Sequence, residues 1–272
     1  MSSPTHITFA GAGPGDPGLV TVRLAKALKT AQCILVDRLV NPEIIKLYAD
    51  SCAEIIFVGK QAYESESTAQ ADINTILVQK AMAGIETIRL KGGDVAIYSN
   101  VLDEIHALSE AGISYEIIPG ITAASGAVAS LGIPLTGRGV APGVQIHSMS
   151  LLEEPDEASV SGWASSTDTL VFYMSISPLK KLVCRLLEFN ADPMLPLAII
   201  EEATGLHQIN TIHTLRSFAD LKDPISFKSP SIVIIGRMIH EIADQAKFNQ
   251  INPNSIFTPV NIKTKNHIIH VI

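Results

Sequence analysis

The first half of the chain alternates short apolar runs with longer segments in which apolar residues recur at helical spacing. The apolar runs predict strands at residues 7–10, 33–36, 54–58, 87–90 and 115–118. The longer segments predict helices at residues 21–30, 42–48, 69–83, 102–110 and 122–131. Strands that alternate with helices are typical of crossover connections, so this order predicts an α/β domain built on a largely parallel sheet.

The second half of the chain has a different rhythm. Apolar runs predict strands at residues 144–147, 169–174, 197–201, 208–214 and 231–236. One helical segment, at residues 177–189, lies between the second and the third of these strands. Because few helices separate the strands, antiparallel neighbours can pair directly, and we expect a mixed sheet.

A cluster of proline and glycine at residues 133–143 separates the two halves. Such clusters favour turns and linkers, so we predict an N-terminal α/β domain at residues 1–136 and a C-terminal α/β domain at residues 137–243. Residues 244–272 are polar and rich in turn-forming residues. We expect a tail there, returning as a short strand at residues 268–272.

The charge balance limits the classes of partner. The 272 residues include 20 Lys and Arg against 27 Asp and Glu, a formal net charge of −7. Nucleic-acid binding depends on neutralising phosphates, so the acid excess argues against a nucleic acid as the main partner. No apolar run approaches the roughly 18 residues of a membrane span, and the first residues lack a signal-peptide pattern, so we expect no membrane partner.

The spacing of cysteine and histidine argues against disulfides and metals. Cys33, Cys52 and Cys184 are far apart and form neither a disulfide framework nor a CxxC motif, which favours a reducing cytoplasm. The eight histidines show neither HxH nor HxxxH spacing. We therefore expect no metal site.

The first predicted strand runs into a glycine-rich turn, Gly11-Ala-Gly-Pro-Gly-Asp-Pro-Gly18. A strand, a glycine turn and a helix suggest a dinucleotide site, with Asp37 as the ribose-binding acid. The spacing argues against it, because the third glycine of G-x-G-x-x-G falls on Asp16. Pro14 and Pro17 also remove amide donors that a pyrophosphate uses. A nicotinamide-dependent oxidoreductase stays open as the alternative from another class of enzyme.

Seven motifs follow one another along the chain. They are Gly11-Ala-Gly-Pro-Gly-Asp-Pro17, Val36-Asp-Arg-Leu-Val40, Val58-Gly-Lys60, Arg89-Leu-Lys-Gly-Gly-Asp94, Ile118-Pro-Gly-Ile-Thr-Ala-Ala-Ser125, Gly132-Ile-Pro-Leu-Thr136 and Phe172-Tyr-Met174. In this order they resemble the uroporphyrinogen-III C-methyltransferases, within the S-adenosylmethionine-dependent tetrapyrrole methylase family. The resemblance implies a two-domain α/β tetrapyrrole methylase fold, with a mostly parallel N-terminal sheet and a mixed C-terminal sheet. It also implies a cofactor cleft between the domains and a homodimer.

The resemblance implies which residues bind the cofactor. Carried over position by position, the S-adenosyl-L-methionine contacts are Pro14, Gly92, Gly93, Asp94, Ile97, Thr122, Ala123, Met174 and Ala203. Glycines admit a ligand close to the backbone, and Asp94 can accept hydrogen bonds from hydroxyl or amine groups. Taken alone, Met174 is more typical of a core and Thr122 of a helix cap. Ala203 is glycine in many relatives.

The reaction implied by the resemblance is C-methylation of uroporphyrinogen III, performed twice to give precorrin-2 for sirohaem or cobalamin synthesis. The other product is S-adenosyl-L-homocysteine. A sulfonium carbon is already a strong electrophile, so alignment and proton management are the main tasks of such an enzyme. The resemblance assigns Asp37 as proton acceptor and Lys60 as proton donor, and Glu104 is a second candidate base. Without the resemblance, Asp37, Lys60 and Glu104 are each typical of surface charges.

The eight carboxylates of that substrate require cations on the protein. The available residues are Arg38, Lys60, Lys91 and Arg138. The arginine side chain forks onto a carboxylate better than lysine does, so we expect Arg138 first and Arg38 second to bind the substrate.

One stretch departs from the family pattern. Most relatives read K-G-G-D-P-F-x-F-G-R-G-x-E-E, whereas this chain reads Lys91-Gly-Gly-Asp-Val-Ala-Ile-Tyr-Ser-Asn-Val-Leu-Asp-Glu104. Asn100 replaces an arginine thought to meet substrate carboxylates, and Val101 and Leu102 follow it in the altered stretch. A methyltransferase acting on another precorrin or related tetrapyrrole therefore stays open, as does a non-catalytic tetrapyrrole-binding protein.

Overall fold

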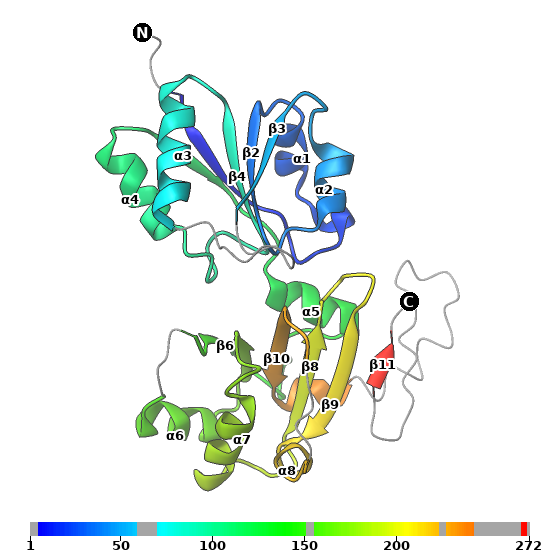
Figure 1. Cartoon of the computed structure of the whole chain (residues 1–272). Helices are drawn as coiled ribbons and strands as arrows, with labels where there is room; N and C mark the ends of the chain where they lie inside the picture. The colour runs from blue at the N-terminus through cyan, green and yellow to red at the C-terminus, as the bar shows by residue number, and fades with distance from the viewer. Residues whose placement is uncertain (1–4, 59–69, 151–154, 223–226, 242–267, 271–272) are drawn as a thin grey trace. The chain divides into compact units, whose positions relative to one another are not determined.

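The computed structural model describes residues 5–58, 70–150, 155–222, 227–241 and 268–270 (Figure 1). Contacts divide the chain into two compact units, Met1–Ala123 and Ala124–Ile272. The sequence predicted the boundary later, at residue 136. The boundary lies earlier because α5 (Ala123–Leu131) belongs to the second unit from Ala124 onward. The Ala124 amide donates to the Tyr173 hydroxyl at 2.9 Å.

The first unit contains a five-stranded sheet in which every pair of neighbours is parallel, in the order β3-β2-β4-β1-β5. The strands are β1 (Ile7–Gly11), β2 (Cys33–Asp37), β3 (Glu54–Val58), β4 (Thr87–Lys91) and β5 (Tyr115–Ile118). This arrangement confirms the parallel sheet predicted from the alternation of apolar runs and helices.

Helices cover both faces of this sheet (Figure 1). They are α1 (Val22–Leu28), α2 (Pro42–Tyr48), α3 (Gln70–Met82) and α4 (Leu102–Glu110), with a short 3-10 helix, η1 (Pro17–Leu19), before α1. Alternate residues of a strand point to opposite faces. Ile34 and Val36 of β2 therefore share a core with α1 and α2, whereas Leu35 shares one with α3 and α4.

The strand order creates a switch point between β1 and β4. From β1 the chain passes through α1 to β2, which lies on one side of the β4–β1 pair. From β4 it passes through α4 to β5, which lies on the other side of that pair. In open α/β sheets, ligands bind outside the carboxyl ends of such diverging neighbours. The turns after Gly11 and after Lys91 lie at this point.

The second unit contains a mixed sheet in the order β11-β9-β8-β10-β7-β6. Its strands are β6 (Val144–Ser148), β7 (Thr169–Tyr173), β8 (Pro196–Glu201), β9 (Ile209–Thr214), β10 (Ser231–Ile235) and β11 (Ile268–His270). Among the described strands, β6 and β7 pair in parallel and the other neighbours are antiparallel. The mixed sheet confirms the expectation for this half. β11 lies within the stretch where a short returning strand was predicted.

Three helices, α6 (Glu157–Ser165), α7 (Leu179–Glu188) and α8 (Leu215–Ala219), share the core of this sheet. Trp163 of α6 and Leu182 of α7 pack with Phe172 of β7 there. A 3-10 helix, η2 (Arg237–His240), follows β10. In the described part of the chain, no helix combines the length and the apolar character needed to cross a bilayer.

Candidate functional site

Four glycines bring three loops of the first unit into backbone contact at the switch point. The Gly13 amide donates to the Gly93 carbonyl at 3.1 Å, and the Gly93 amide donates back to the Gly13 carbonyl at 2.8 Å. Both residues have positive φ, 81° and 67°, a conformation that favours glycine. A Cβ on Gly11 would lie 2.6 Å from the Gly93 carbonyl oxygen, and one on Gly120 would clash with the same atom. These four glycines, called the glycine crossing below, therefore let the three loops pack backbone against backbone.

Asp94 follows this crossing directly. Its Oδ1 accepts the Ala96 amide at 3.1 Å, and the Ile97 amide donates to the Asp94 carbonyl at 3.2 Å. These bonds fix a half-buried carboxylate in a tight turn. A carboxylate has acceptor capacity for several donors, so Asp94 can also bind hydroxyl or amine groups of a ligand.

The structure brings the predicted contacts of the first unit together around the crossing. A Cβ on Gly93 would lie 3.7 Å from the Ala123 nitrogen, so the start of α5 is adjacent to the glycine turn. Thr122 is half-buried just before it. Pro14 follows Gly13 directly, and Gly92 is next to the crossing on the other strand. A backbone cradle with one carboxylate suits a nucleoside-bearing cofactor.

Non-glycine residues in the left-handed region cluster near predicted cofactor contacts. Among the described residues there are six, Tyr98, Asn100, Met174, Asn190, Glu202 and Thr204. Tyr98 and Asn100 follow Ile97, Met174 is itself a predicted contact, and Glu202 and Thr204 flank Ala203. Such conformations cost free energy and persist where function uses them. Five of the six thus lie at or beside residues that the sequence singled out.

Met174 and Ala203 belong to the second unit. Met174 directly follows β7 with 49% of its surface exposed, and its sulfur accepts the Ser150 hydroxyl at 3.0 Å. Ala203 is 9% exposed and lies in the turn after β8. Tyr173, beside Met174, holds the first turn of α5 through its hydroxyl. Sequence reasoning missed Ser150 and Tyr173, because their roles depend on contacts between distant segments.

Below the site, β4 buries two cations against an acid. Ile88 and Leu90 face α1 and α2, so Arg89 and Lys91 point to the opposite face. There α4 presents Glu104, which has no exposed surface. Arg89 and Lys91 are only 2% and 3% exposed. Charges buried this deeply are expected to be paired.

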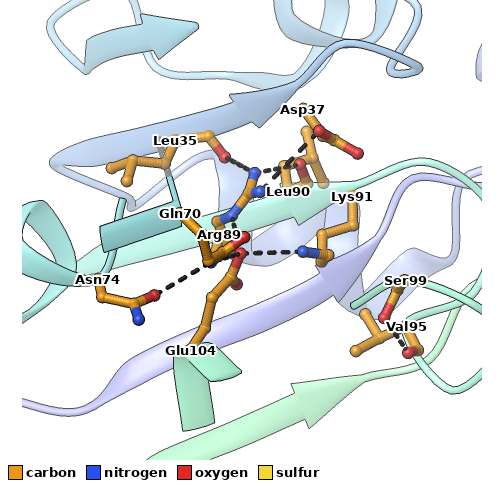
Figure 2. Close-up of polar contacts among 10 residues, drawn as sticks. All are labelled: Leu35, Asp37, Gln70, Asn74, Arg89, Leu90, Lys91, Val95, Ser99 and Glu104. Atoms are coloured by element: carbon orange, nitrogen blue, oxygen red, sulfur yellow. Dashed lines mark hydrogen bonds and ion pairs between the residues drawn. The ribbon is translucent and has the colours of Figure 1, made fainter. Parts of the chain in front are cut away.

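Figure 2 shows Glu104 reaching both cations of β4. Its Oε1 accepts from Lys91 Nζ at 3.0 Å and from Arg89 Nε at 3.2 Å. Gln70 donates to the same oxygen at 3.4 Å, while Oε2 has no partner among the described residues. Arg89 Nη2 also lies 3.9 Å from Asp37 Oδ1. With Asp37 included, the cluster has two positive and two negative charges.

This placement changes the expected roles of Glu104 and Lys91. We expected Glu104 as a candidate base and Lys91 as a substrate contact. In the described part of the chain both are buried and already paired with each other. Burial lowers the pKa of Lys91, aided by the nearby Arg89 and opposed by Glu104. Both residues therefore act in the structure as members of an internal ion cluster.

The other predicted charges are accessible or lie outside the described residues. Asp37, at the carboxyl end of β2, has a side chain 33% exposed, and Arg38 beside it is exposed. Arg138 is exposed in a turn closed by the Gly137 amide, which donates to the Ala141 carbonyl at 3.0 Å. Lys60 lies outside the described residues. Arg89 was not singled out from the sequence, although a lone arginine in an apolar strand is a signal for a buried ion pair.

No group of three or more His, Cys, Asp or Glu side chains suited to a metal occurs in the ranges that the structure describes.

Comparison with known proteins places this chain in one class. The family model for tetrapyrrole (corrin/porphyrin) methylases matches residues 6–219. The chain therefore belongs to the tetrapyrrole methylase family.

Within this family, the chain is similar to proteins named uroporphyrinogen-III C-methyltransferase and siroheme synthase. It is 36% identical over 237 residues to the uroporphyrinogen-III C-methyltransferase of Bacillus subtilis (strain 168), covering 86% of this chain and 48% of that protein. It is 39% identical over 234 residues to siroheme synthase 2 of Pectobacterium atrosepticum, covering 86% and 50%. The chain spans about half the length of the curated relatives it matches.

A solved structure is similar in fold. The uroporphyrin-III C-methyltransferase of Thermus thermophilus, complexed with S-adenosyl homocysteine, superposes with a TM-score of 0.72 at 29% identity. The match covers 87% of this chain and 94% of that one. Enzymes of this kind are thus similar to the chain in both sequence and structure.

Proposed function

We propose that the protein is an S-adenosylmethionine-dependent C-methyltransferase that converts uroporphyrinogen III to precorrin-2 by two methyl transfers, for sirohaem or cobalamin synthesis. One observation carries the proposal: the glycine crossing holds the Gly92–Asp94 turn, with its half-buried carboxylate, at the switch point of the sheet. The relatives named above, one of them with S-adenosyl homocysteine bound, support this identity of cofactor and substrate.

The residues around the crossing fit the cofactor. When bound, S-adenosylmethionine supplies an electrophilic methyl group on a positively charged sulfur. Gly92 and Gly93 admit the ligand to the backbone, and the Asp94 carboxylate accepts hydrogen bonds from its hydroxyl groups. Ile97 and Met174 offer apolar surface for packing, with the remaining contacts at Pro14, Thr122, Ala123 and Ala203.

Asp37 is the residue that we propose to take up the proton released after the ring carbon is methylated. Its side chain is one-third exposed, so a substrate can reach it. Arg89 Nη2 lies 3.9 Å from its Oδ1, and the Arg89 guanidinium is itself held by Glu104. Glu104, itself paired with Lys91, thus keeps Arg89 in place beside the proposed base. Lys60 remains the proposed proton donor.

Exposed arginines are proposed to bind the substrate. Arg38 is next to the proposed base, and Arg138 projects from a short turn. Bidentate arginine–carboxylate pairs provide both affinity and orientation for a substrate with many carboxylates.

A second candidate is methylation of another precorrin. Asn100, exposed and in the left-handed region at φ 57°, stands where relatives have an arginine. An anaerobic assay with labelled methyl donor compares the candidates. A mass gain of two methyl groups on uroporphyrinogen III supports the first, and turnover of only a later precorrin supports the second.

The cofactor site is tested by calorimetry with S-adenosyl homocysteine. Asp94→Ala is expected to weaken binding by about 100-fold, because a hydrogen bond to a charged group is lost. Asp103→Ala, which removes an exposed acid of α4, is the matched control and is expected to bind as the wild type does. Equal binding by wild type and Asp94→Ala would contradict the assigned site. Tight binding of NAD would instead favour an oxidoreductase.

The remaining expectations complete the proposal: a homodimer in the cytoplasm that uses no metal and binds neither nucleic acid nor membrane. The dimer rests on what the resemblance of the seven sequence motifs implies, and three free cysteines among the described residues suit a reducing compartment. Analytical ultracentrifugation tests the dimer. Full activity after dialysis against a chelator is expected, because the sulfonium group needs no Lewis acid.

A further inference from the structure

The turn that carries Ala203 is held in an unusual conformation. Glu202 and Thr204 adopt φ values of 47° and 65°, which cost free energy in residues other than glycine. The Glu202 amide donates to the Pro230 carbonyl at 2.8 Å, and the Gly205 amide donates to the Glu202 carbonyl at 2.8 Å. The backbone of this turn therefore needs support from its surroundings to keep its shape.

One buried side chain provides that support. Gln208 is 3% exposed, and its Oε1 accepts the Thr204 amide at 2.5 Å. Its Nε2 donates to Ser130 Oγ at 2.8 Å and to Asn210 Oδ1 at 2.9 Å. Ser130 Oγ in turn donates to the Ala127 carbonyl at 2.7 Å, which leaves its lone pairs for Gln208. The Gln208 amide thus joins the turn to α5 and β9.

Only glutamine matches these three partners at this position. The site needs one acceptor for the Thr204 amide and two donors for the oxygens of Ser130 and Asn210. Glutamate has no donors when ionised, and methionine has neither a strong donor nor a strong acceptor. Asn210 Nδ2 has no partner in the described part of the chain. If the Asn210 amide group rotated by half a turn, its Oδ1 would no longer accept the hydrogen bond from Gln208 Nε2.

We propose that Gln208 is a positioning residue for the cofactor, which fixes the Glu202–Thr204 turn so that the backbone at Ala203 is ready to contact S-adenosylmethionine. This inference rests on the proposed function. A preformed turn avoids an ordering cost on binding, so loss of the support weakens the affinity of the folded protein for the cofactor.

The test compares Gln208→Met and Gln208→Glu with the wild type. Binding of S-adenosyl homocysteine is measured by calorimetry, and the melting temperature by differential scanning calorimetry. We expect Kd to rise by about tenfold in both variants, with a raised KM for S-adenosylmethionine and a smaller change in kcat. Leu206→Ala is the control, because Leu206 is 87% exposed in the same turn and should leave Kd unchanged.

A merely structural role would lower the melting temperature and leave the Kd of the folded protein unchanged, and this result would overturn the inference. If the Gln208 variants do not fold, Ser130→Ala decides, since it removes one anchor of the amide and leaves a good helix former. It should raise Kd by about threefold, and an unchanged Kd would again overturn the inference. A wild type that does not bind S-adenosyl homocysteine would refute the proposed function itself.

Discussion

Each unit of the protein buries a polar network next to residues that we propose to bind the cofactor, and the two networks differ in charge. In the first unit, Glu104 balances Arg89 and Lys91. In the second, the neutral amide of Gln208 joins Ser130 and Asn210. In the first, a carboxylate of α4 pairs with two cations of strand β4, and in the second, Ser130 of α5 anchors the amide that holds the Thr204 turn. A charged network depends on every member, because removing one leaves an uncompensated buried charge, whereas a neutral network loses only hydrogen bonds.

The largest expected effect is that of Glu104→Gln, which keeps the shape of the side chain and removes the anion between two buried cations. We expect the free energy of unfolding to fall by about 3–5 kcal/mol, measured by urea denaturation. Asp103→Asn, on the exposed side of the same helix, should change it by less than about 0.5 kcal/mol. A cost for Glu104→Gln as small as that of its control would show that the cluster is not energetically coupled.

Ser130→Ala should have a smaller effect on stability, because the network it touches is neutral. Loss of one hydrogen bond to Gln208 is expected to lower the free energy of unfolding by about 1 kcal/mol in the same urea experiment. Ser125→Ala, at an exposed position of α5, is the matched control. If Ser130→Ala cost as much as Glu104→Gln, charge would not explain the difference between the networks.

The smallest expected effect is a change in pH dependence on replacing Lys91. Its pKa in the folded protein lies below the ordinary value of 10.5, mainly because of burial. The unfolded chain therefore binds more protons between these two values, and this residue makes stability rise with pH in that window. Lys91→Met removes the contribution. Urea denaturation between the lowered pKa and pH 10.5 should show a flatter slope for the variant, and parallel slopes would contradict the assignment.

The sheets were predictable because each strand is a short apolar run between turn residues. α4 was predicted with its observed bounds, Leu102–Glu110, since Gly112 ends the helical pattern. α6 was missed because its serines and Gly162 hide the apolar periodicity, and its start depends on Asp156, whose carboxylate accepts the Ser159 amide at 2.6 Å.

Residues of the candidate site that belong to a sequence motif could be predicted. Residues whose role depends on tertiary contacts could not. The turn at Gly92–Asp94 could be located from its sequence pattern, and the structure places it at the switch point. That Glu104 would point inward at Arg89 depends on how α4 is rotated against β4. A strand pattern shows that Arg89 faces the α4 side, but it does not name the partner there.

The exposed thioether at the end of β7 has a practical consequence. Oxygen converts such a sulfur to a sulfoxide, which is larger, polar and chiral, and can no longer pack as a hydrocarbon-like surface. Met174, with 49% of its surface accessible, is open to this damage. Preparations stored in air would accumulate a fraction with an altered side chain at this proposed cofactor contact. Purification under nitrogen, with a methionine sulfoxide reductase as the repair control, therefore protects the protein itself as well as its assay.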